Sequence, residues 1–136
     1  MDTLIDTLHQ GGYSCVIRKG TEVRTFQQRG VKDLWELCES EEGFLQGAQI
    51  ADKVIGKGAA ALMIYGGIHE VYADVISTPA LELLQKHNIH VAYAQQTDRI
   101  LNRKRDGLCP VETLCHPLQS LEEMYSAITN FIKQKS

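Results

Sequence analysis

Hydrophobic and polar positions along this chain switch between the spacing of helices and the spacing of strands. Leucine and isoleucine recur at helical spacing near the N-terminus, and Gly11-Gly12 ends that segment. Apolar and polar residues then alternate in Tyr13–Arg18 and in Glu22–Phe26, on either side of a break at Lys19-Gly20. This pattern predicts a helix followed by a β-hairpin, and a short helix over Lys32–Cys38 comes next.

The middle of the chain predicts a helix that leads into a buried strand. Alanine and isoleucine recur at helical spacing in Phe44–Ile55, and Gly56 and Gly58 are expected to close that helix. Ala59–Tyr65 is a continuous apolar run of strand length between glycines, which favours a central buried strand. The following Gly66-Gly67 pair allows a sharp turn or a close approach of the backbone to a ligand.

The second half of the chain continues with strands and helices in alternation. Ile68–Ile76 fits either a helix or a strand. Thr78-Pro79 is a helix start with threonine as the N-cap, and His87-Asn88 is the stop. Ile89–Ala94 is the next strand, and the polar stretch Gln95–Gly107 is predicted to be partly loop.

Two further helix starts lie near the C-terminus. Cys109-Pro110 has the form of a cap followed by a proline at the first helical position. Ser120 and Glu123 form a capping box that opens an amphipathic helix over residues 120–134. An initial hairpin followed by alternating strands and helices predicts one domain over residues 1–136, a three-layer α/β/α sandwich with a mixed sheet.

Composition and charge exclude several classes of protein. The content of 43% hydrophobic and 23% charged residues is ordinary for a globular domain of 136 residues. The net charge is −3 and no long basic run occurs, so we expect no binding to nucleic acid. No apolar run approaches the roughly 20 residues of a membrane helix, and the acidic N-terminus is not that of a signal peptide. The four scattered cysteines fit reduced thiols in a cytoplasmic protein.

Two stretches, IADKVIGKGAAAL and ILNRKRDGLCPVETL, resemble the signatures of a small bacterial and archaeal family of unknown function. STPALELLQKHNI and the hairpin with its preceding helix agree with the same family, and the resemblance extends to about Pro117. The usual CPME of the family is CPVE here, which keeps the cysteine, the proline and the glutamate. The resemblance implies a cytidine-deaminase-like fold that lacks the deaminase zinc site, and it allows a homodimer or a higher homo-oligomer.

Zinc-dependent deamination needs three protein ligands, an open position for water and a glutamate that moves protons. True deaminases supply these from an HAE-type motif and a PCxxC motif, whereas this chain offers Ala51-Asp52-Lys53 and a YGGIHEVYAD stretch without cysteine. Cys109, Cys115 and His116 match no standard zinc spacing. We therefore expect no metal site and no cofactor.

Asp52 is the first candidate for chemistry, because it lies among the apolar positions of the predicted helix 44–55. As a functional residue it would bind a ligand hydroxyl or act as a base; as a structural residue it would accept hydrogen bonds from a neighbouring loop. Burial would raise its pKa, and Lys53, Lys57 or a helix N-terminus would lower it. The two lysines share a face of that helix and, beside Gly56 and Gly58, would suit a phosphate.

Cys109 is the second candidate. As the N-cap before Pro110 its sulfur would lie near unpaired amide hydrogens, which favour the thiolate and lower its pKa. Glu112 would bond back to the Cys109 amide, and this capping arrangement alone explains the CPVE stretch. A nucleophilic or redox-sensitive cysteine is the functional alternative, although the sequence places no histidine beside it.

The polar cluster that contains Asn102 and Arg103 is either a solvated loop or a ligand-binding loop, in which Gly107 lets the backbone approach the ligand. We expect this loop, as far as Glu112, to converge with Asp52, Lys53 and the Gly66-Gly67 turn on one pocket. The predicted function is binding of a small ligand, best a nucleotide or a nucleotide-derived molecule. The alternative is a metal-independent enzyme that acts on a nucleoside or nucleotide with Asp52, Lys53 and Cys109.

Overall fold

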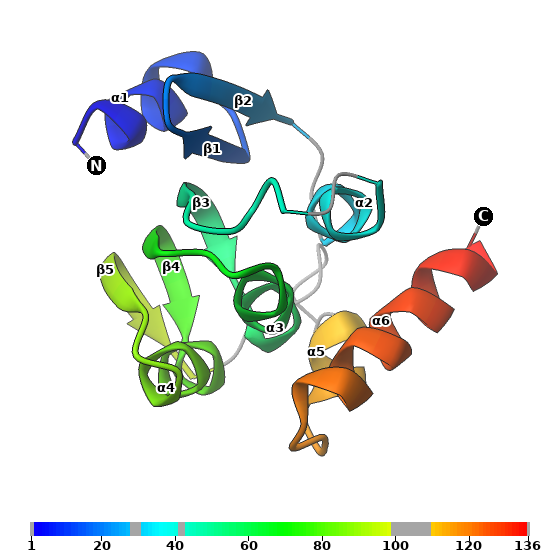
Figure 1. The fold of residues 1–136 in the computed structure, drawn as a ribbon. Coiled ribbons are helices and arrows are strands. Elements are labelled where there is room, and N and C mark those ends of the chain that lie inside the picture. Colours follow the sequence, from blue (N-terminus) through cyan, green and yellow to red (C-terminus); the bar gives the residue numbers. More distant parts are fainter. Residues whose placement is uncertain (1, 28–30, 41–42, 99–109, 136) are drawn as a thin grey trace.

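The computed structural model describes residues 2–27, 31–40, 43–98 and 110–135 (Figure 1). The elements in chain order are α1 (Asp2–Gly11), β1 (Cys15–Lys19), β2 (Glu22–Phe26), α2 (Lys32–Ser40), β3 (Gln49–Ile55), α3 (Lys57–Gly66), β4 (Glu70–Ser77), α4 (Thr78–Lys86), β5 (His90–Thr97), α5 (Pro110–Cys115) and α6 (Leu121–Lys135).

The strands form one five-stranded mixed sheet in the order β2-β1-β3-β4-β5. β1 runs antiparallel to both β2 and β3, whereas β3, β4 and β5 are parallel. The carboxyl ends of the three parallel strands therefore share one edge of the sheet, and the amino end of β1 lies at the same edge. The chain thus belongs to the α/β class with a mixed sheet, as the sequence predicts.

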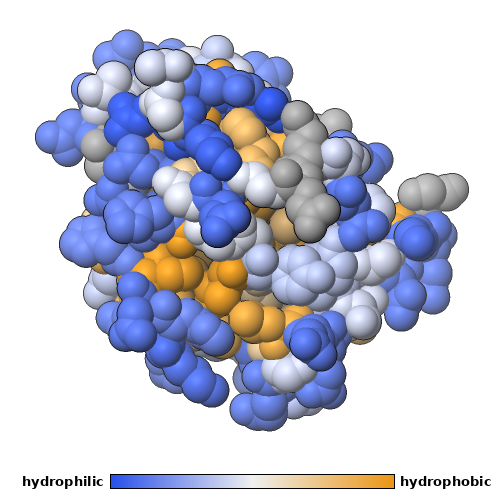
Figure 2. Space-filling view, in the orientation of Figure 1, coloured by the Kyte–Doolittle hydropathy of each residue, from blue (hydrophilic) through white to orange (hydrophobic). Residues whose placement is uncertain are grey.

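Helices cover both faces of this sheet. α1 packs against β1 and β3 through Leu4 and Leu8, which contact Val16 and Ala51 on one face. α2, α3 and α4 lie on the opposite face, and α3 is also in contact with α5 and α6 (Figure 1). Figure 2 shows the same view in space-filling form, with hydrophobic side chains gathered near the middle of the face and hydrophilic ones around its rim. α3 is therefore the central helix of the molecule.

Several predicted elements are confirmed. The hairpin forms with Lys19 and Glu22 as its last pair, and Gly20 takes the left-handed conformation (φ 60°) that its turn requires. α2 and α6 occupy their predicted places, and the backbone N–H of Glu123 donates to Ser120 Oγ at 3.0 Å. The predicted start of α4 shifts by one residue, because Ser77 rather than Thr78 is the N-cap and accepts from the Ala80 N–H.

The secondary structure predicted for the middle of the chain is wrong, because the structure has a strand where a helix was predicted and a helix where a strand was predicted. The predicted helix Phe44–Ile55 contains strand β3, and the predicted strand Ala59–Tyr65 is helix α3. Gly56 does not end a helix but is the N-cap of α3, and Gly58 lies in its first turn. The stretch 68–76, which fitted either element, forms most of strand β4.

Two other points follow from the described residues. β5 extends to Thr97, so the first part of the polar stretch Gln95–Gly107 is strand. Within the described ranges, no helix is long and apolar enough to cross a membrane.

Candidate functional site

Asp52 lies on β3 and not on a helix. Its partner in the register of β1 is Cys15, which belongs to the core on the α2 and α3 side, so both side chains point to that face. The carboxyl group and the Cys15 thiol share a hydrogen bond, and the backbone N–H of Val54 donates to Asp52 Oδ1 at 3.1 Å. Asp52 is half-buried and Cys15 is buried. An acid therefore sits at the rim of the core, three residues before its strand ends.

Burial raises the pKa of the Asp52 carboxyl from 3.8 to about 7. Hydrogen bonds from the backbone N–H groups of Val54 and Lys53, and the bond with Cys15, oppose this rise in pKa. The negative charge of Asp74 adds to it. Near neutral pH the carboxyl group is consequently divided between its acid and its carboxylate form, which suits a group that accepts or releases a proton.

The Cys15 thiol is held in its neutral form. Burial, followed by the negative charges of Asp52 and Asp33, raises its pKa well above the usual 9.0. A neutral thiol donates a weak hydrogen bond to a carboxylate. Cys15 therefore acts as a partner of Asp52 and not as a nucleophile.

The first turn of α3 follows strand β3 directly, after the single residue Gly56. Its N-cap, Gly56, supplies no side-chain hydrogen bond to the helix. The start of α5 packs against this turn so closely that a Cβ on Gly58 would meet Val111 Cγ1 at 2.3 Å. The carboxyl end of β3, the positive end of the α3 dipole and the start of α5 thus meet at one place.

The two predicted phosphate-binding lysines do not share a helix face, because Lys53 is on a strand and Lys57 is on a helix. Lys53 is exposed, and strand alternation places its side chain on the face opposite to that of Asp52. Lys57 Nζ donates to the backbone oxygens of His116 and Leu118, both at 3.0 Å. Lys57 therefore fastens the segment after α5 to the first turn of α3.

The Gly66-Gly67 turn lies at the other end of α3. Gly67 is the C-cap of α3 and takes the left-handed conformation (φ 86°). Its backbone N–H donates to the backbone oxygens of Ile64 and Met63. Ten helical residues span about 15 Å, so α3 separates this turn from Asp52. The structure therefore does not bring the Gly66-Gly67 turn close to Asp52, contrary to the expectation from the sequence.

The remaining predicted site residues fall wholly or partly outside the described part of the chain. Asn102, Arg103, Gly107 and Cys109 lie in residues 99–109 and stay predictions. Glu112 belongs to α5, but its side chain is not among those described. Among the described residues, Val111 at the start of α5 lies beside Gly58 in the first turn of α3.

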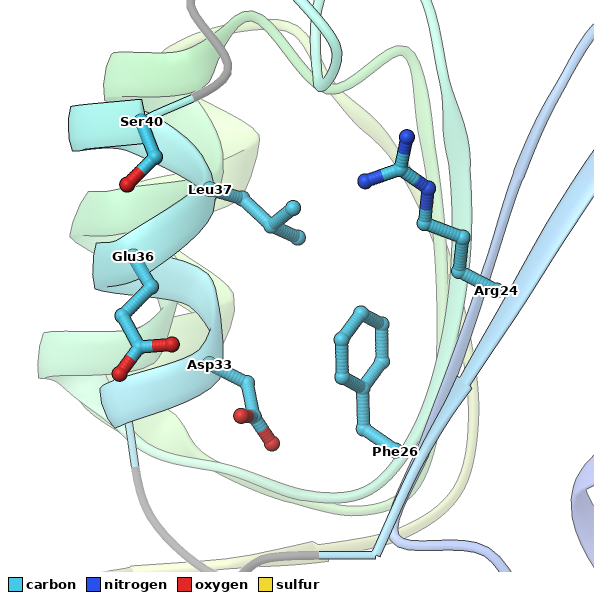
Figure 3. A pocket seen from close by; sticks show the side chains of 6 residues that line it. All are labelled: Arg24, Phe26, Asp33, Glu36, Leu37 and Ser40. Carbon is cyan, nitrogen blue, oxygen red and sulfur yellow. The ribbon is translucent and has the colours of Figure 1, made fainter.

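A small cavity lies between β2 and α2 (Figure 3). Its volume is about 200 Å³, and it is lined by Arg24, Phe26, Asp33, Glu36, Leu37 and Ser40. In Figure 3, Leu37 of α2 points toward Phe26 of β2, and the Arg24 guanidinium lies at the end away from Asp33. Arg24 Nε donates to Glu22 Oε2 at 2.6 Å, and its guanidinium carbon lies 3.9 Å from the centre of the Phe44 ring.

Cys15 lies between Asp52 and Phe26, a residue of the cavity wall, in the sheet. In the sheet register Cys15 pairs with Phe26 on one side and with Asp52 on the other, so the three form a row across β2, β1 and β3. Asp52 does not line the cavity and stands two strands away from Phe26, about 10 Å. Burial and the charge of Glu36 raise the pKa of Asp33, although Lys32 lowers it. Two carboxyl groups on the α2 wall disfavour a phosphate inside the cavity.

The sequence analysis did not select the residues of this cavity. A signal was present, because Arg24 and Phe26 alternate onto the same face of β2. Asp33 and Glu36 are also spaced three apart, so they lie on one side of α2. Across the described residues, no group of three histidine, cysteine, aspartate or glutamate side chains is arranged to hold a metal ion.

Comparisons with known proteins place the chain in a family. The family model TM1506, described as a domain of unknown function (DUF1893), matches residues 3–132. The chain is also similar to a DUF1893-family protein from Thermotoga maritima (TM1506) whose crystal structure is known, with a TM-score of 0.87 and 23% identity over 95% of this chain and 87% of that one. No curated protein matches the chain. The chain therefore belongs to the TM1506 family, a domain of unknown function (DUF1893).

Proposed function

We propose that this protein binds a small nucleotide or nucleotide-derived ligand at the carboxyl edge of its parallel strands. The observation that carries the proposal is Asp52, a carboxyl group whose burial beside Cys15 raises its pKa to about 7. Holding an acid in such surroundings costs stability, and groups with strongly shifted pKa values cluster at functional sites.

The surroundings of Asp52 support a ligand that has both a polar, uncharged part and an anionic part. The carboxyl group suits a hydroxyl or an amino group of the ligand, as found on a ribose or a base. The first turn of α3, where Gly56 offers backbone only, suits a phosphate. In this proposal Asn102, Arg103, Gly107, Cys109 and Glu112 complete the site from the segment that leads into α5.

The nucleotide class itself rests on the resemblance to a cytidine-deaminase-like fold, which we propose for this chain as well. The arrangement of a mixed sheet with three parallel strands and helices on both faces is compatible with that fold. Fold alone does not determine function, so the class of ligand needs a direct test.

A second candidate function is a metal-independent enzyme that acts on a nucleoside or nucleotide. The value of the Asp52 pKa, about 7, favours it, because a general acid or base works best when its pKa lies near the working pH. In this case Asp52 would move a proton of the substrate, and Cys109 would be the candidate nucleophile.

The proposal is tested by a thermal-shift screen of nucleosides, nucleotides and dinucleotides on the wild type and on Asp52→Asn. The matched control is Glu82→Gln, which removes an exposed carboxyl group on α4 that is not one of the proposed site residues. We expect at least one ligand that stabilises the wild type and Glu82→Gln but stabilises Asp52→Asn much less. Following that ligand over time for conversion then separates an enzyme from a binding protein.

Two results contradict the proposal. A panel without any stabilising ligand counts against the nucleotide class. A ligand that binds equally well to the wild type, Asp52→Asn and Cys109→Ser shows that the site lies elsewhere.

A further inference from the structure

The two edges of the sheet differ sharply. The edge strand β2 has five residues, and it carries Glu22 and Arg24, which form an ion pair of 2.6 Å. The opposite edge strand, β5, has eight residues and the sequence HVAYAQQT, which contains no lysine, arginine, aspartate, glutamate or proline. Natural proteins usually protect a sheet edge with a short strand, charges, proline or a bulge, and β2 follows this rule whereas β5 does not.

β5 also pairs with β4 in one continuous register, and most of its residues are exposed to solvent. Its register with β4 keeps one offset from Glu70↔His90 to Ser77↔Thr97, so no bulge bends the strand. Six of its residues are exposed, namely His90, Ala92, Tyr93, Ala94, Gln95 and Gln96. Figure 1 shows β5 at the border of the sheet, and among the described residues no strand pairs with its outer side. A row of backbone N–H and C=O groups therefore faces outward along the strand.

We propose that the outer edge of β5 binds the same edge of a second copy of this chain. Backbone groups on an open edge are satisfied best by another strand, which selects a β-strand as the occupant. Each chain carries a net charge of −3, but β5 has no lysine, arginine, aspartate or glutamate, so two copies of this strand can pair without like charges meeting in the contact. Two copies of one strand can also pair around a two-fold axis, so that both copies make the same contacts.

Symmetry fixes how the strands face each other. A two-fold axis perpendicular to the sheet makes the pair antiparallel and keeps the same face of both sheets on the same side. With Tyr93 on the axis, Tyr93 lies opposite Tyr93 of the second copy, and Ala92 lies opposite Ala94. Tyr93 is 42% exposed in one chain, so this register places an aromatic pair at the centre of the interface.

The test is the mass of the full chain in solution, measured by light scattering and by sedimentation from micromolar to millimolar concentrations. We expect the wild type to approach twice 15.2 kDa as the concentration rises. Tyr93→Lys places two like charges opposite each other on the axis, so association should weaken by at least about tenfold. The matched control is Val23→Lys on β2, where the original side chain is 48% exposed, and it should associate as the wild type does.

The register has its own test. An equimolar mixture of Tyr93→Lys and Tyr93→Glu should recover the dimer, because opposite charges then meet on the axis. Circular dichroism shows whether each variant is folded, and Ala92→Lys replaces Tyr93→Lys if the latter does not fold.

Three outcomes overturn the proposal. The first is a wild type that stays at 15.2 kDa over the whole range. The second is a folded Tyr93→Lys or Ala92→Lys that associates like the wild type. The third is a Val23→Lys variant that loses association to the same degree. Failure of the charge-swapped mixture to recover the dimer overturns the register with Tyr93 on the axis.

Discussion

Replacing Asp52 by asparagine removes one ionisable group and keeps the shape of the side chain, so the pH dependence of stability isolates its effect. The folded-state pKa of Asp52 is raised from 3.8 to about 7. Between these values the folded protein holds a proton that the unfolded chain has lost. The contribution of Asp52 to stability is therefore greatest at acidic pH and decreases as the pH rises toward 7 and beyond.

The magnitude follows from the size of the shift. Each pKa unit corresponds to 1.36 kcal/mol, and a fully sealed carboxyl group with a pKa of about 7 would cost between two and three kcal/mol more at pH 8 than at pH 5. Asp52 is half-buried, and contact with water reduces this cost, so we expect about 2 kcal/mol. Asparagine does not ionise, and the variant should lack this decrease in stability.

Urea unfolding of the wild type and Asp52→Asn at several pH values between 5 and 8 measures the effect. Other titrating groups cancel in the difference between the two proteins, and Glu82→Gln serves as the control for loss of an exposed carboxyl group. The stability of Asp52→Asn relative to the wild type should rise by about 2 kcal/mol between pH 5 and pH 8, because the wild type loses this amount over that range and the asparagine variant does not. Two parallel curves would refute the raised pKa. An asparagine variant that is less stable by about 1–3 kcal/mol at every pH would show that Asp52 is a structural hydrogen-bond acceptor.

Three further predictions concern thiols, metal and packing. Alkylation at neutral pH, mapped by mass spectrometry, should label Cys109 first, because burial raises the pKa of Cys15 well above 9.0 and that of Cys38 to about 11; faster labelling of either would contradict the cap position of Cys109. Elemental analysis of protein purified without chelator should give far less than one zinc per chain, and stoichiometric zinc that is lost in Cys109→Ser would overturn this. Gly58→Ala should cost about 1–3 kcal/mol of unfolding free energy, because its Cβ would meet Val111 Cγ1 at 2.3 Å; adding Val111→Ala should relieve part of the clash, and additive costs would refute this packing.

Elements with a clear period or a local cap are predictable from this sequence. The hairpin has strict alternation around a glycine turn, and α6 has a capping box and one apolar face. α4 is read from Pro79 and its apolar stripe, in which Leu81 and Leu84 are buried. In each case the element buries one face only, so its period is visible in the sequence.

The prediction for the stretch that contains β3 and α3 is wrong because both elements are buried on more than one side. β3 has α1 on one face and α3 on the other, so Ile50 and Ala51 are both buried and the alternation is lost. α3 is surrounded by the sheet and by other helices, so its run of apolar residues shows no helical period. Residue type was the better signal, because Ala59–Ala61 favour a helix whereas the β-branched Val54 and Ile55 favour a strand.

This inversion changes which residues act together. On a helix the side chains of Asp52 and Lys53 would point about 100° apart, whereas on β3 they point to opposite faces of the sheet. The side-chain partner of the Asp52 carboxyl group is accordingly distant in sequence, because Cys15 comes from the hairpin. The association of Asp52 with Cys15 depends on strand register, which hydrophobic pattern alone does not specify for residues so far apart. The sequence could therefore select Asp52 from its unusual position, while its partner became identifiable only when β1 was placed between β2 and β3.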